Sequence, residues 1–185
     1  MLNKTDDYDL VRKFISGDEQ AFNLLVSRHQ NRIYWHARRM VGNHDDADEI
    51  VQEVLLVMYQ KLRSFNYKSA LYTWIYKITS TRNLNLLKKN KIKRMISFDS
   101  ENNKEISASD DVIVNIEQKE KFEKMQRYLK NLPAKQREIF IFRNFDDLSY
   151  EEIADITGKA VGTLKANYFH AFNKLKELMD EYENK

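Results

Sequence analysis

Cations and aromatic rings are interleaved between Lys61 and Phe98, and this mixture is the part of the sequence best suited to chemistry. The stretch carries ten lysines and arginines and no acid. Its aromatic residues include Phe65, Tyr67, Tyr72, Trp74 and Tyr76. Ammonium and guanidinium groups neutralise phosphates while rings stack on unpaired bases, so the mixture suits single-stranded nucleic acid. A solvated basic helix over an aromatic core would have the same composition.

The preceding stretch, Val41 to Gln60, has the opposite charge, with five acids and no lysine or arginine. From Asp45 onward, apolar residues recur at helical spacing on one face: Ala47, Ile50, Val51, Val54, Val57, Met58 and Leu62. The opposite face carries Asp45, Asp48, Glu49, Gln52 and Glu53, followed by Leu56 and Tyr59. An acidic stripe that ends in apolar residues is typical of a docking surface for a basic helix. The alternative, acids that complement the helix macrodipole, explains the first turn but leaves Leu56 unexplained.

A third pattern lies near the C-terminus, where Ser149 and Glu152 form a capping box that predicts a helix start. Ala154, Gly158 and Leu164 then follow the spacing of a helix-turn-helix, with a small residue, a turn glycine and a buried aliphatic. The expected outer face of the second helix carries Lys165, Ala166, Phe169, His170 and Asn173. Such a helix could enter a major groove, with Lys159 and Thr163 contacting phosphate at its start. Helical hairpins of this kind also occur in proteins that never bind DNA.

The elements that position these groups are expected to be helices throughout. The chain has 185 residues, 42% of them hydrophobic, but only four glycines and one proline, too few for the turns of a β-sandwich or barrel. We therefore predict an all-α fold of two small helical domains, the second containing the helix-turn-helix. The polar, acidic and non-periodic segment 96–112 is expected to be a flexible linker between residues 1–95 and 113–185.

Several function classes find no support in the sequence. There is no cysteine, so disulfides, thiolate zinc sites and cysteine nucleophiles are excluded and a reducing cytoplasm fits. The N-terminus lacks a signal-peptide pattern, and no apolar run approaches the roughly 20 residues that span a bilayer, so we expect no membrane insertion. The glycines form no phosphate loop and the four histidines have no ligand spacing. We therefore expect no metal, no cofactor, no catalytic residues and no enzymatic activity.

Several motifs occur in a fixed order along the chain. Residues 46–55, DADEIVQEVL, are similar to a D-A-x-D/E-I-x-Q-E-x-F segment, and residues 73–78, TWIYKI, follow Phe65 as in an F…TWLYRI segment. LP at 132–133, QRE at 136–138, SYEEIA at 149–154 and GTLK at 162–165 complete the set. Together they resemble regions two and four of the bacterial extracytoplasmic-function (ECF) sigma factors, the small two-domain initiation subunits of RNA polymerase.

This resemblance implies a function and a set of partners. Residues 1–95 would be sigma region two, 96–112 the linker and 113–185 sigma region four. The protein would bind core RNA polymerase through the β′ clamp helices and the β flap. It would recognise the minus-thirty-five and minus-ten promoter elements, as duplex and as melted single strand, and nucleate melting. The family commonly has an anti-sigma factor, so one is expected here.

The resemblance also implies roles for individual residues. The polymerase-binding residues would be Asp48, Glu49, Gln52, Glu53 and Leu56. An unstacked base of the minus-ten element would be captured by the loop residues Phe65, Asn66, Tyr67, Lys68 and Ser69, and the adjacent strand held by Lys77, Thr81 and Lys88. The minus-thirty-five duplex would be contacted by Lys159, Thr163, Lys165, Ala166, Phe169, His170 and Asn173.

The sequence departs from the family at several of these positions. Thr81 stands where many members have Asn, and the recognition helix has Lys165-Ala166-Asn167 in place of K-S-R. His170 and Phe172 stand where Arg is common, so the electrostatic part of duplex binding should be weaker. Two other interpretations remain open. One is a conventional repressor or activator with an effector-binding N-terminal lobe, and the other is an adaptor that binds a partner helix through the acidic stripe.

Overall fold

The computed structural model describes residues 6–96 and 116–183, with side chains from 118 to 180 in the second range. Within these ranges the chain is helical and has no strand, so the predicted all-α fold is confirmed. The helices in chain order are α1 (Asp7–Ile15), α2 (Glu19–Val41), α3 (His44–Lys61), the 3-10 turn η1 (Leu62–Ser64), α4 (Leu71–Ile96), α5 (Ile116–Lys130), α6 (Ala134–Asn144), α7 (Tyr150–Thr157) and α8 (Val161–Glu183). We call α1–α4 the N-terminal lobe and α5–α8 the C-terminal lobe. The predicted linker, 96–112, falls outside the described residues except for Ile96, the last residue of α4.

Side-chain caps set where α2, α3 and α7 begin. The Asp18 carboxylate accepts from the first turn of α2, and the Asn43 side chain accepts from the Asp46 amide of α3. The predicted capping box at the start of α7 is confirmed, because Ser149 and Glu152 bond reciprocally. Gly158 ends the same helix with a φ of 69°, a left-handed conformation that glycine adopts without strain.

The N-terminal lobe is held together by the apolar face predicted for α3. Ala47, Ile50, Val54 and Met58 on that face are each at most 1% exposed. They pack in one cluster with apolar residues of α1 and α2 and with the first turn of α4. Each fully buried aliphatic side chain contributes about 1.5–3 kcal/mol, so this face fixes α3 and leaves its opposite side to solvent.

The C-terminal lobe is built around the helix-turn-helix. Ile139 and Phe142 on α6, Ile153 on α7 and Leu164 on α8 have no exposed surface and belong to one cluster. Leu164 therefore occupies the buried position that the helix-turn-helix spacing predicts. Because this residue anchors the second helix against the first, the opposite side of α8 remains exposed.

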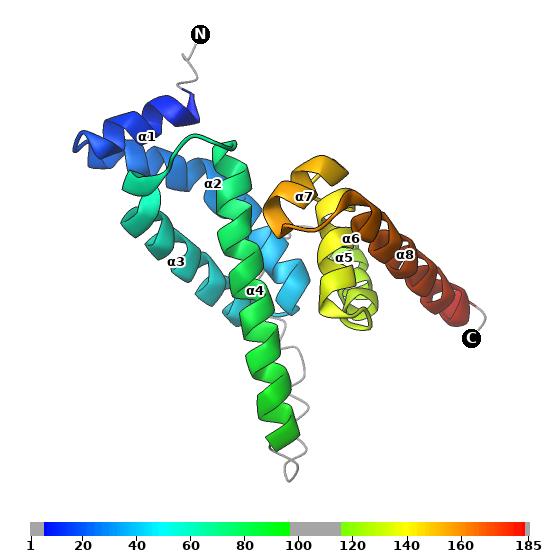
Figure 1. Cartoon of the computed structure of the whole chain (residues 1–185). Helices are drawn as coiled ribbons and strands as arrows, with labels where there is room; N and C mark the ends of the chain where they lie inside the picture. The colour runs from blue at the N-terminus through cyan, green and yellow to red at the C-terminus, as the bar shows by residue number, and fades with distance from the viewer. Residues whose placement is uncertain (1–5, 97–115, 184–185) are drawn as a thin grey trace.

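The two lobes pack directly against each other. In Figure 1, α4 lies between the remaining N-terminal helices and the C-terminal lobe, and its C-terminal end projects beyond both. Helix α2 contacts α5 and α6, and helix α4 contacts α6 and α7. The Arg137 guanidinium donates to the Met40 carbonyl at the end of α2, and also to the carbonyls of Lys130 and Leu132. This one cation thus joins the end of α2 to the turn between α5 and α6.

Candidate functional site

The acidic stripe lies on the exposed side of α3. Glu49, Gln52 and Leu56 follow helical spacing and are all exposed, and 57% of Leu56 is open to solvent. Asp48 lies 3.2 Å from the His44 imidazole, and Glu53 lies 3.4 Å from the cationic Arg82 guanidinium, which partly neutralises it. The stripe is thus an apolar side chain bordered by polar and acidic groups, which is the pattern of a protein–protein contact.

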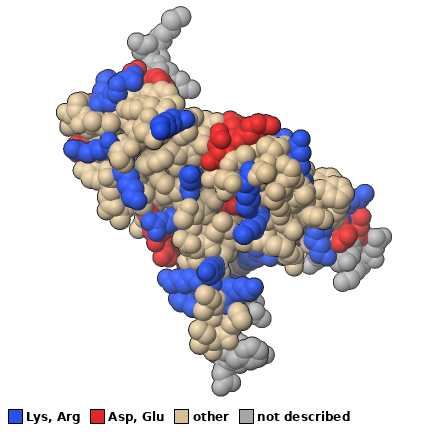
Figure 2. Space-filling view, in the orientation of Figure 1, with Lys and Arg blue, Asp and Glu red and all other residues tan. Residues whose placement is uncertain are grey.

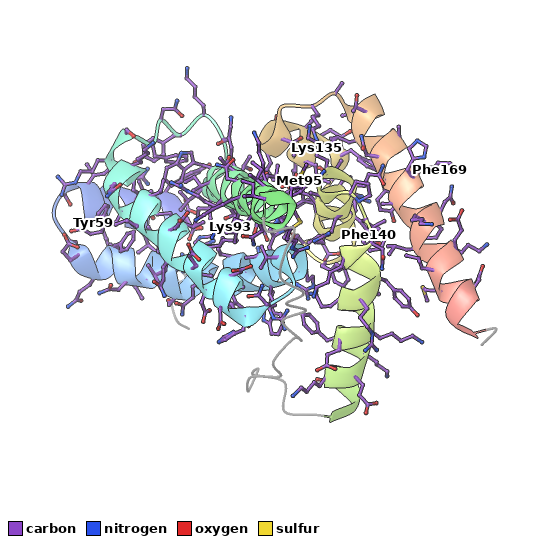
Figure 3. The ribbon with its side chains drawn as sticks, turned by 90° about the horizontal axis from the view of Figure 1, so that it is seen from below. Tyr59, Lys93, Met95, Lys135, Phe140 and Phe169 are labelled. Carbon is purple, nitrogen blue, oxygen red and sulfur yellow. The ribbon has the colours of Figure 1, made fainter. Side chains whose placement is uncertain are left out.

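Tyr59 extends the same surface by one turn and is shown on α3 in Figure 3. Its ring lies 5.2 Å from that of Phe22 and 5.5 Å from that of Phe14, while its hydroxyl donates to Glu19. These contacts fix the ring, although 45% of the residue is exposed. Tyr59 is therefore a rigid apolar neighbour of Leu56 on α3.

Aromatic packing fixes the loop before α4. Phe65 is only 6% exposed, and its ring lies 5.1 Å from Tyr67 and 5.6 Å from Trp74. Tyr67 is 39% exposed and has a φ of 57°, a left-handed conformation that is uncommon outside glycine. Of the two predicted aromatic residues, Tyr67 presents its ring to solvent and Phe65 supports it.

Polar groups tighten this loop, and one of its contacts was missed at the sequence level. The Asn66 side chain accepts from the Lys68 amide at 3.1 Å, forming a local turn. Tyr8 of α1 donates to the Ser69 carbonyl at 3.3 Å, and its ring lies 5.6 Å from Tyr67. No pattern in the sequence points to Tyr8, because it is distant along the chain and lies on an ordinary amphipathic helix.

The outer side of α4 carries the predicted strand-binding residues. Lys77, Thr81 and Lys88 are exposed and follow helical spacing. The Thr81 hydroxyl donates to the Lys77 carbonyl at 2.8 Å, so it is bonded to its own helix. The C-terminal part of α4 adds Lys89, Lys91, Lys93 and Arg94, and Figure 2 shows this cationic surface on the projecting end. The surface is suited to a phosphate backbone.

The predicted duplex-binding residues lie on and before α8. Thr163, Lys165, Ala166, Phe169 and His170 are exposed, while Lys159 and Asn173 are partly buried. Figure 3 shows Phe169 on the outer side of α8. The structure thus forms three separate groups from the predicted residues: the α3 face, the loop with the outer side of α4, and the start of α8.

Acidic groups of the C-terminal lobe meet polar groups of α4. Tyr72 donates to the Glu152 carboxylate; this bond, with those from Ser149, holds the pKa of Glu152 below its ordinary value. Ser80 donates to Glu138 at 2.6 Å, yet burial raises the pKa of Glu138 because desolvation outweighs that bond. These contacts lie beside the outer side of α4 and do not cover Lys77, which is exposed.

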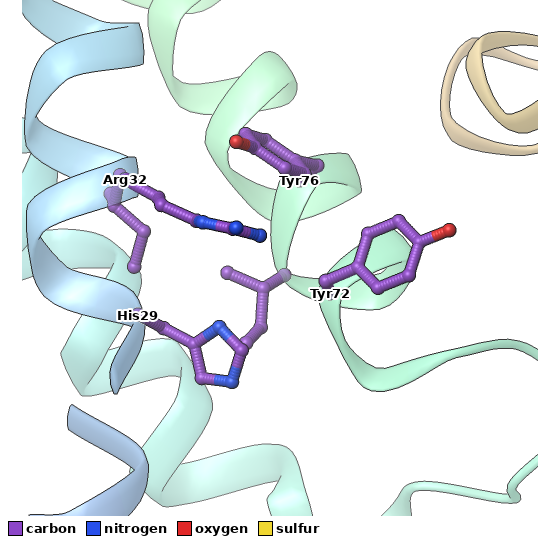
Figure 4. Close-up of a pocket in the computed structure, with 6 residues that line it drawn as sticks. His29, Arg32, Tyr72 and Tyr76 are labelled. Carbon is purple, nitrogen blue, oxygen red and sulfur yellow. The ribbon is translucent and has the colours of Figure 1, made fainter. Parts of the chain in front are cut away.

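A shallow pocket lies between α2 and α4 at the edge of this contact. Its walls are His29, Arg32, Tyr72 and Tyr76, over Ile33 and Ile75 (Figure 4). The His29 imidazole in this pocket is 2.8 Å from the Asp7 carboxylate of α1. Burial raises the pKa of the Tyr76 hydroxyl above its ordinary value. Tyr72 and Tyr76 also touch the C-terminal lobe, so the pocket belongs to the contact between lobes.

The described part of the chain offers neither a cluster of metal-ligating side chains nor a helix suited to crossing a membrane. No group of three or more His, Cys, Asp or Glu side chains there could hold a metal ion. None of its helices is both long enough and apolar enough to cross a bilayer.

Two family models match this chain, one in each lobe. Residues 25–92 match Sigma-70 region 2, and residues 122–175 match Sigma-70, region 4. The first range includes the α3 face, the loop and most of α4, and the second includes the helix-turn-helix.

Curated relatives extend the match to nearly the full length. The ECF RNA polymerase sigma-E factor of Haemophilus influenzae is 31% identical over 197 aligned residues, covering 97% of this chain and all of the relative. The sigma-E factor of Escherichia coli K12 is 33% identical over 181 residues, covering 92% of this chain and 93% of the relative.

Two solved structures share the fold. CnrH in complex with the cytosolic domain of CnrY has a TM-score of 0.72 at 20% identity, covering 95% of this chain and 97% of CnrH. RpoE in complex with the anti-sigma factor NepR from Bartonella quintana has a TM-score of 0.67 at 24% identity, covering 86% and 96%. The motif order, both region matches and the full-length relatives agree, and the chain belongs to the ECF sigma factors of RNA polymerase.

Proposed function

We propose that this sigma factor separates its two tasks between neighbouring helices of one lobe. The exposed side of α3 docks on the β′ clamp helices of core polymerase, while the loop and outer side of α4 hold the melted minus-ten strand. The observation that carries this proposal is the change of sign between them: acids around an exposed leucine on α3, and cations without acids along α4. Residues 1–95 act as region two, 96–112 as the linker, and 113–185 as region four.

Docking on polymerase depends on Leu56 and its polar border. A side chain that is 57% exposed loses the most surface when a partner covers it, so Leu56 is the centre of the contact. Glu49 and Gln52 lie on the same side, and carboxylates there steer a basic helix into register. Glu53 is already paired with the Arg82 guanidinium in the free protein and contributes less charge than Glu49.

Capture of the minus-ten strand begins at Tyr67. Stacking of one base on an aromatic ring gains about 1–3 kcal/mol, whereas opening DNA costs about 1.4 kcal/mol per base-pair step. One ring therefore offsets the opening of one or two pairs, and the polymerase must extend the bubble. Lys77 and Lys88 hold the backbone of the same strand along the exposed side of α4.

The C-terminal lobe anchors the duplex, and α8 enters the major groove of the minus-thirty-five element. Lys159 and Thr163 contact phosphate at the start of the helix, and Lys165, Ala166, Phe169, His170 and Asn173 face the groove. The same lobe contacts the β flap.

We also propose an anti-sigma partner for this chain. The similar structures support it, because CnrH is in complex with the cytosolic domain of CnrY and RpoE is in complex with the anti-sigma factor NepR. The protein acts in the cytoplasm and has no catalytic residues of its own.

Charge reversal on α3 tests the docking proposal. Glu49→Lys with Gln52→Lys should weaken binding to purified core enzyme at least about tenfold, since like charges would face the clamp. Thermal unfolding should stay unchanged, because both side chains are exposed. Gln118→Lys with Glu120→Lys on α5 changes the charge equally elsewhere and is the matched control. Promoter-dependent transcription at limiting sigma should fall with the first pair only. Normal core affinity would refute the proposed docking face.

A further inference from the structure

The first three turns of α8, the second helix of the helix-turn-helix, carry only one of the side chains that usually read guanine. Bidentate contacts from Arg or Lys to the O6 and N7 atoms of guanine are the commonest base-specific contacts in the major groove. No arginine follows Arg143 in this chain. In the first three turns of α8 the one lysine is Lys165. Recognition of a guanine-rich duplex would therefore depend on a single side chain.

The polar groups near the start of α8 are engaged within the protein. The Lys165 ammonium lies 5.6 Å from the centroid of the Tyr150 ring, so it is drawn toward the start of α7. The Asn167 side-chain amide donates to the Thr163 carbonyl at 2.8 Å. Two side chains that could donate to a base edge, Lys165 and Asn167, are thus held against the helix-turn-helix itself.

Apolar groups occupy the exposed side of α8 instead. Phe169 is 62% exposed and Ala166 is also exposed, on the side opposite the buried Leu164 and Ala171. Phe172, one turn further on, is 51% exposed. Two exposed phenylalanines one turn apart, with Ala166 beside them, form a contiguous apolar patch of the kind that marks an interaction site.

The Phe172 ring is also held in place from below. It is stacked on Tyr168 at 6.3 Å with an interplanar angle of 25°. The Tyr168 ring is in turn stacked on Phe140 at 5.9 Å and 14°. This column of rings fixes the edge of the apolar face against α6, so the face has a defined shape.

We infer that α8 selects its duplex through the 5-methyl groups of thymines, which Ala166 and Phe169 contact, with Phe172 bordering the same surface. The thymine methyl is the apolar group that the major groove displays, and alanine and phenylalanine are side chains that contact it. The target duplex is therefore rich in A·T pairs at the positions these residues meet. The inference rests on the proposed function of the C-terminal lobe as the duplex anchor.

Removal of the methyl group alone tests this inference. Duplexes are selected from a randomised library with the full-length protein in its complex with core polymerase. The best sequence is then synthesised with thymine or with deoxyuridine in the minus-thirty-five half. We expect affinity to fall about fourfold for each contacted thymine, the ratio that corresponds to exposing one buried methyl-sized group.

Two variants assign the effect to a residue. Phe169→Ala should abolish the difference between thymine and deoxyuridine at its contacted position. Met179→Ala removes another exposed apolar side chain from α8, two to three turns further on, and should leave the difference intact. A 7-deazaguanine substitution in the same duplex reports any reading of guanine N7.

The outcomes separate this inference from the function on which it rests. Equal affinity for thymine and deoxyuridine, with strong loss on 7-deazaguanine substitution, would overturn the inference and leave duplex anchoring intact. If deoxyuridine substitution lowers duplex affinity equally in wild type and in Phe169→Ala, the role of Phe169 is overturned. Failure of the polymerase complex to select any duplex in the minus-thirty-five half would instead overturn the proposed anchoring function, and this inference with it.

Discussion

The Nδ1 atom of His36 lies 2.6 Å from the Oδ2 oxygen of Asp146, and this contact joins α2 to the turn after α6. The His36 side chain has no exposed surface and that of Asp146 is 6% exposed. Phe142 stacks on the imidazole at 4.6 Å, and Tyr76 packs against both rings. The residues are 110 positions apart, so the contact holds the two lobes together independently of the linker.

Asp146→Ala should loosen the docked lobes. The substitution leaves the buried His36 without its carboxylate partner, and a buried polar group that loses its bond costs about 1–3 kcal/mol. Small-angle scattering of the free protein should give a larger radius of gyration than wild type. Asp155→Ala on α7 removes an exposed acid from the same lobe and should change neither scattering nor stability. An unchanged radius for Asp146→Ala would show that the contact does not hold the lobes together.

Glu138→Gln should stabilise the protein at neutral pH. Burial raises the pKa of Glu138, so the folded state binds its proton more tightly than the unfolded chain. The contribution of Glu138 to the free energy of unfolding is therefore largest below its ordinary pKa of 4.5, and it is lost as pH rises through the folded pKa. Glutamine is neutral throughout and can still accept from Ser80.

Calorimetric melts at several pH values check this expectation. The variant should melt higher than wild type near pH 7, by about 2–4 °C for each 1 kcal/mol gained, and the gap should close near pH 4. Glu120→Gln on the exposed side of α5 should show no pH-dependent gap. A gap that widens on acidification would contradict the assigned direction.

The sequence predicted the faces of single helices better than contacts between distant segments. The buried side of α3 followed from the 3.6-residue period of Ala47, Ile50 and Val54, because each helix repeats its environment every turn. The start of α7 followed from Ser149 and Glu152, which interact locally. Such signals lie within one helix and need no knowledge of its neighbours.

Contacts between helices leave no such signal. The approach of Tyr8 to Ser69 and Tyr67 depends on how α1 crosses the loop, which no periodicity encodes. Likewise, the residue type of Phe65 fits both a base-stacking platform and a core side chain. Its burial is decided by three surrounding rings, contributed by Tyr8, Tyr67 and Trp74.

Tyr67→Ala and Phe65→Ala should separate stacking from support. Tyr67→Ala removes the exposed ring and should lower affinity for a single-stranded minus-ten oligonucleotide by about 1–3 kcal/mol, the value of one base stack. It should cost little stability. Phe65→Ala empties a buried position, and a large cavity costs about 3–5 kcal/mol of the free energy of unfolding.

Fluorescence anisotropy with the oligonucleotide and urea unfolding measure the two effects. Tyr59→Ala removes another partly exposed tyrosine, on α3, and should leave strand affinity unchanged. Full strand affinity in Tyr67→Ala would exclude this ring as the stacking platform.

Tyr72→Phe should raise the pH at which the protein loses stability on acidification. The hydrogen bond from Tyr72 is the largest cause of the lowered pKa of Glu152. A carboxyl group whose pKa is lowered by folding stabilises the protein above its ordinary pKa of 4.5, and this stabilisation is lost as pH falls through the folded pKa. Without the hydroxyl, that loss should begin at higher pH. Because Glu152 is only partly buried, the change in unfolding free energy at pH 7 should stay below about 1 kcal/mol. Acid titration by circular dichroism checks the midpoint, and a midpoint equal to wild type would contradict the assigned cause.

Lys77→Ala and Lys88→Ala should each reduce the salt dependence of strand binding. A lysine that neutralises one phosphate contributes about 0.7 to the slope of log affinity against log salt for single-stranded DNA. Each substitution should therefore flatten the slope by about that amount and weaken binding similarly for every sequence, since phosphates carry no base identity. Lys174→Ala, an exposed lysine on α8 paired with Glu177, removes the same charge far from α4 and should leave the slope unchanged. If all three variants flatten the slope equally, binding follows net charge alone and the outer side of α4 has no special place in it.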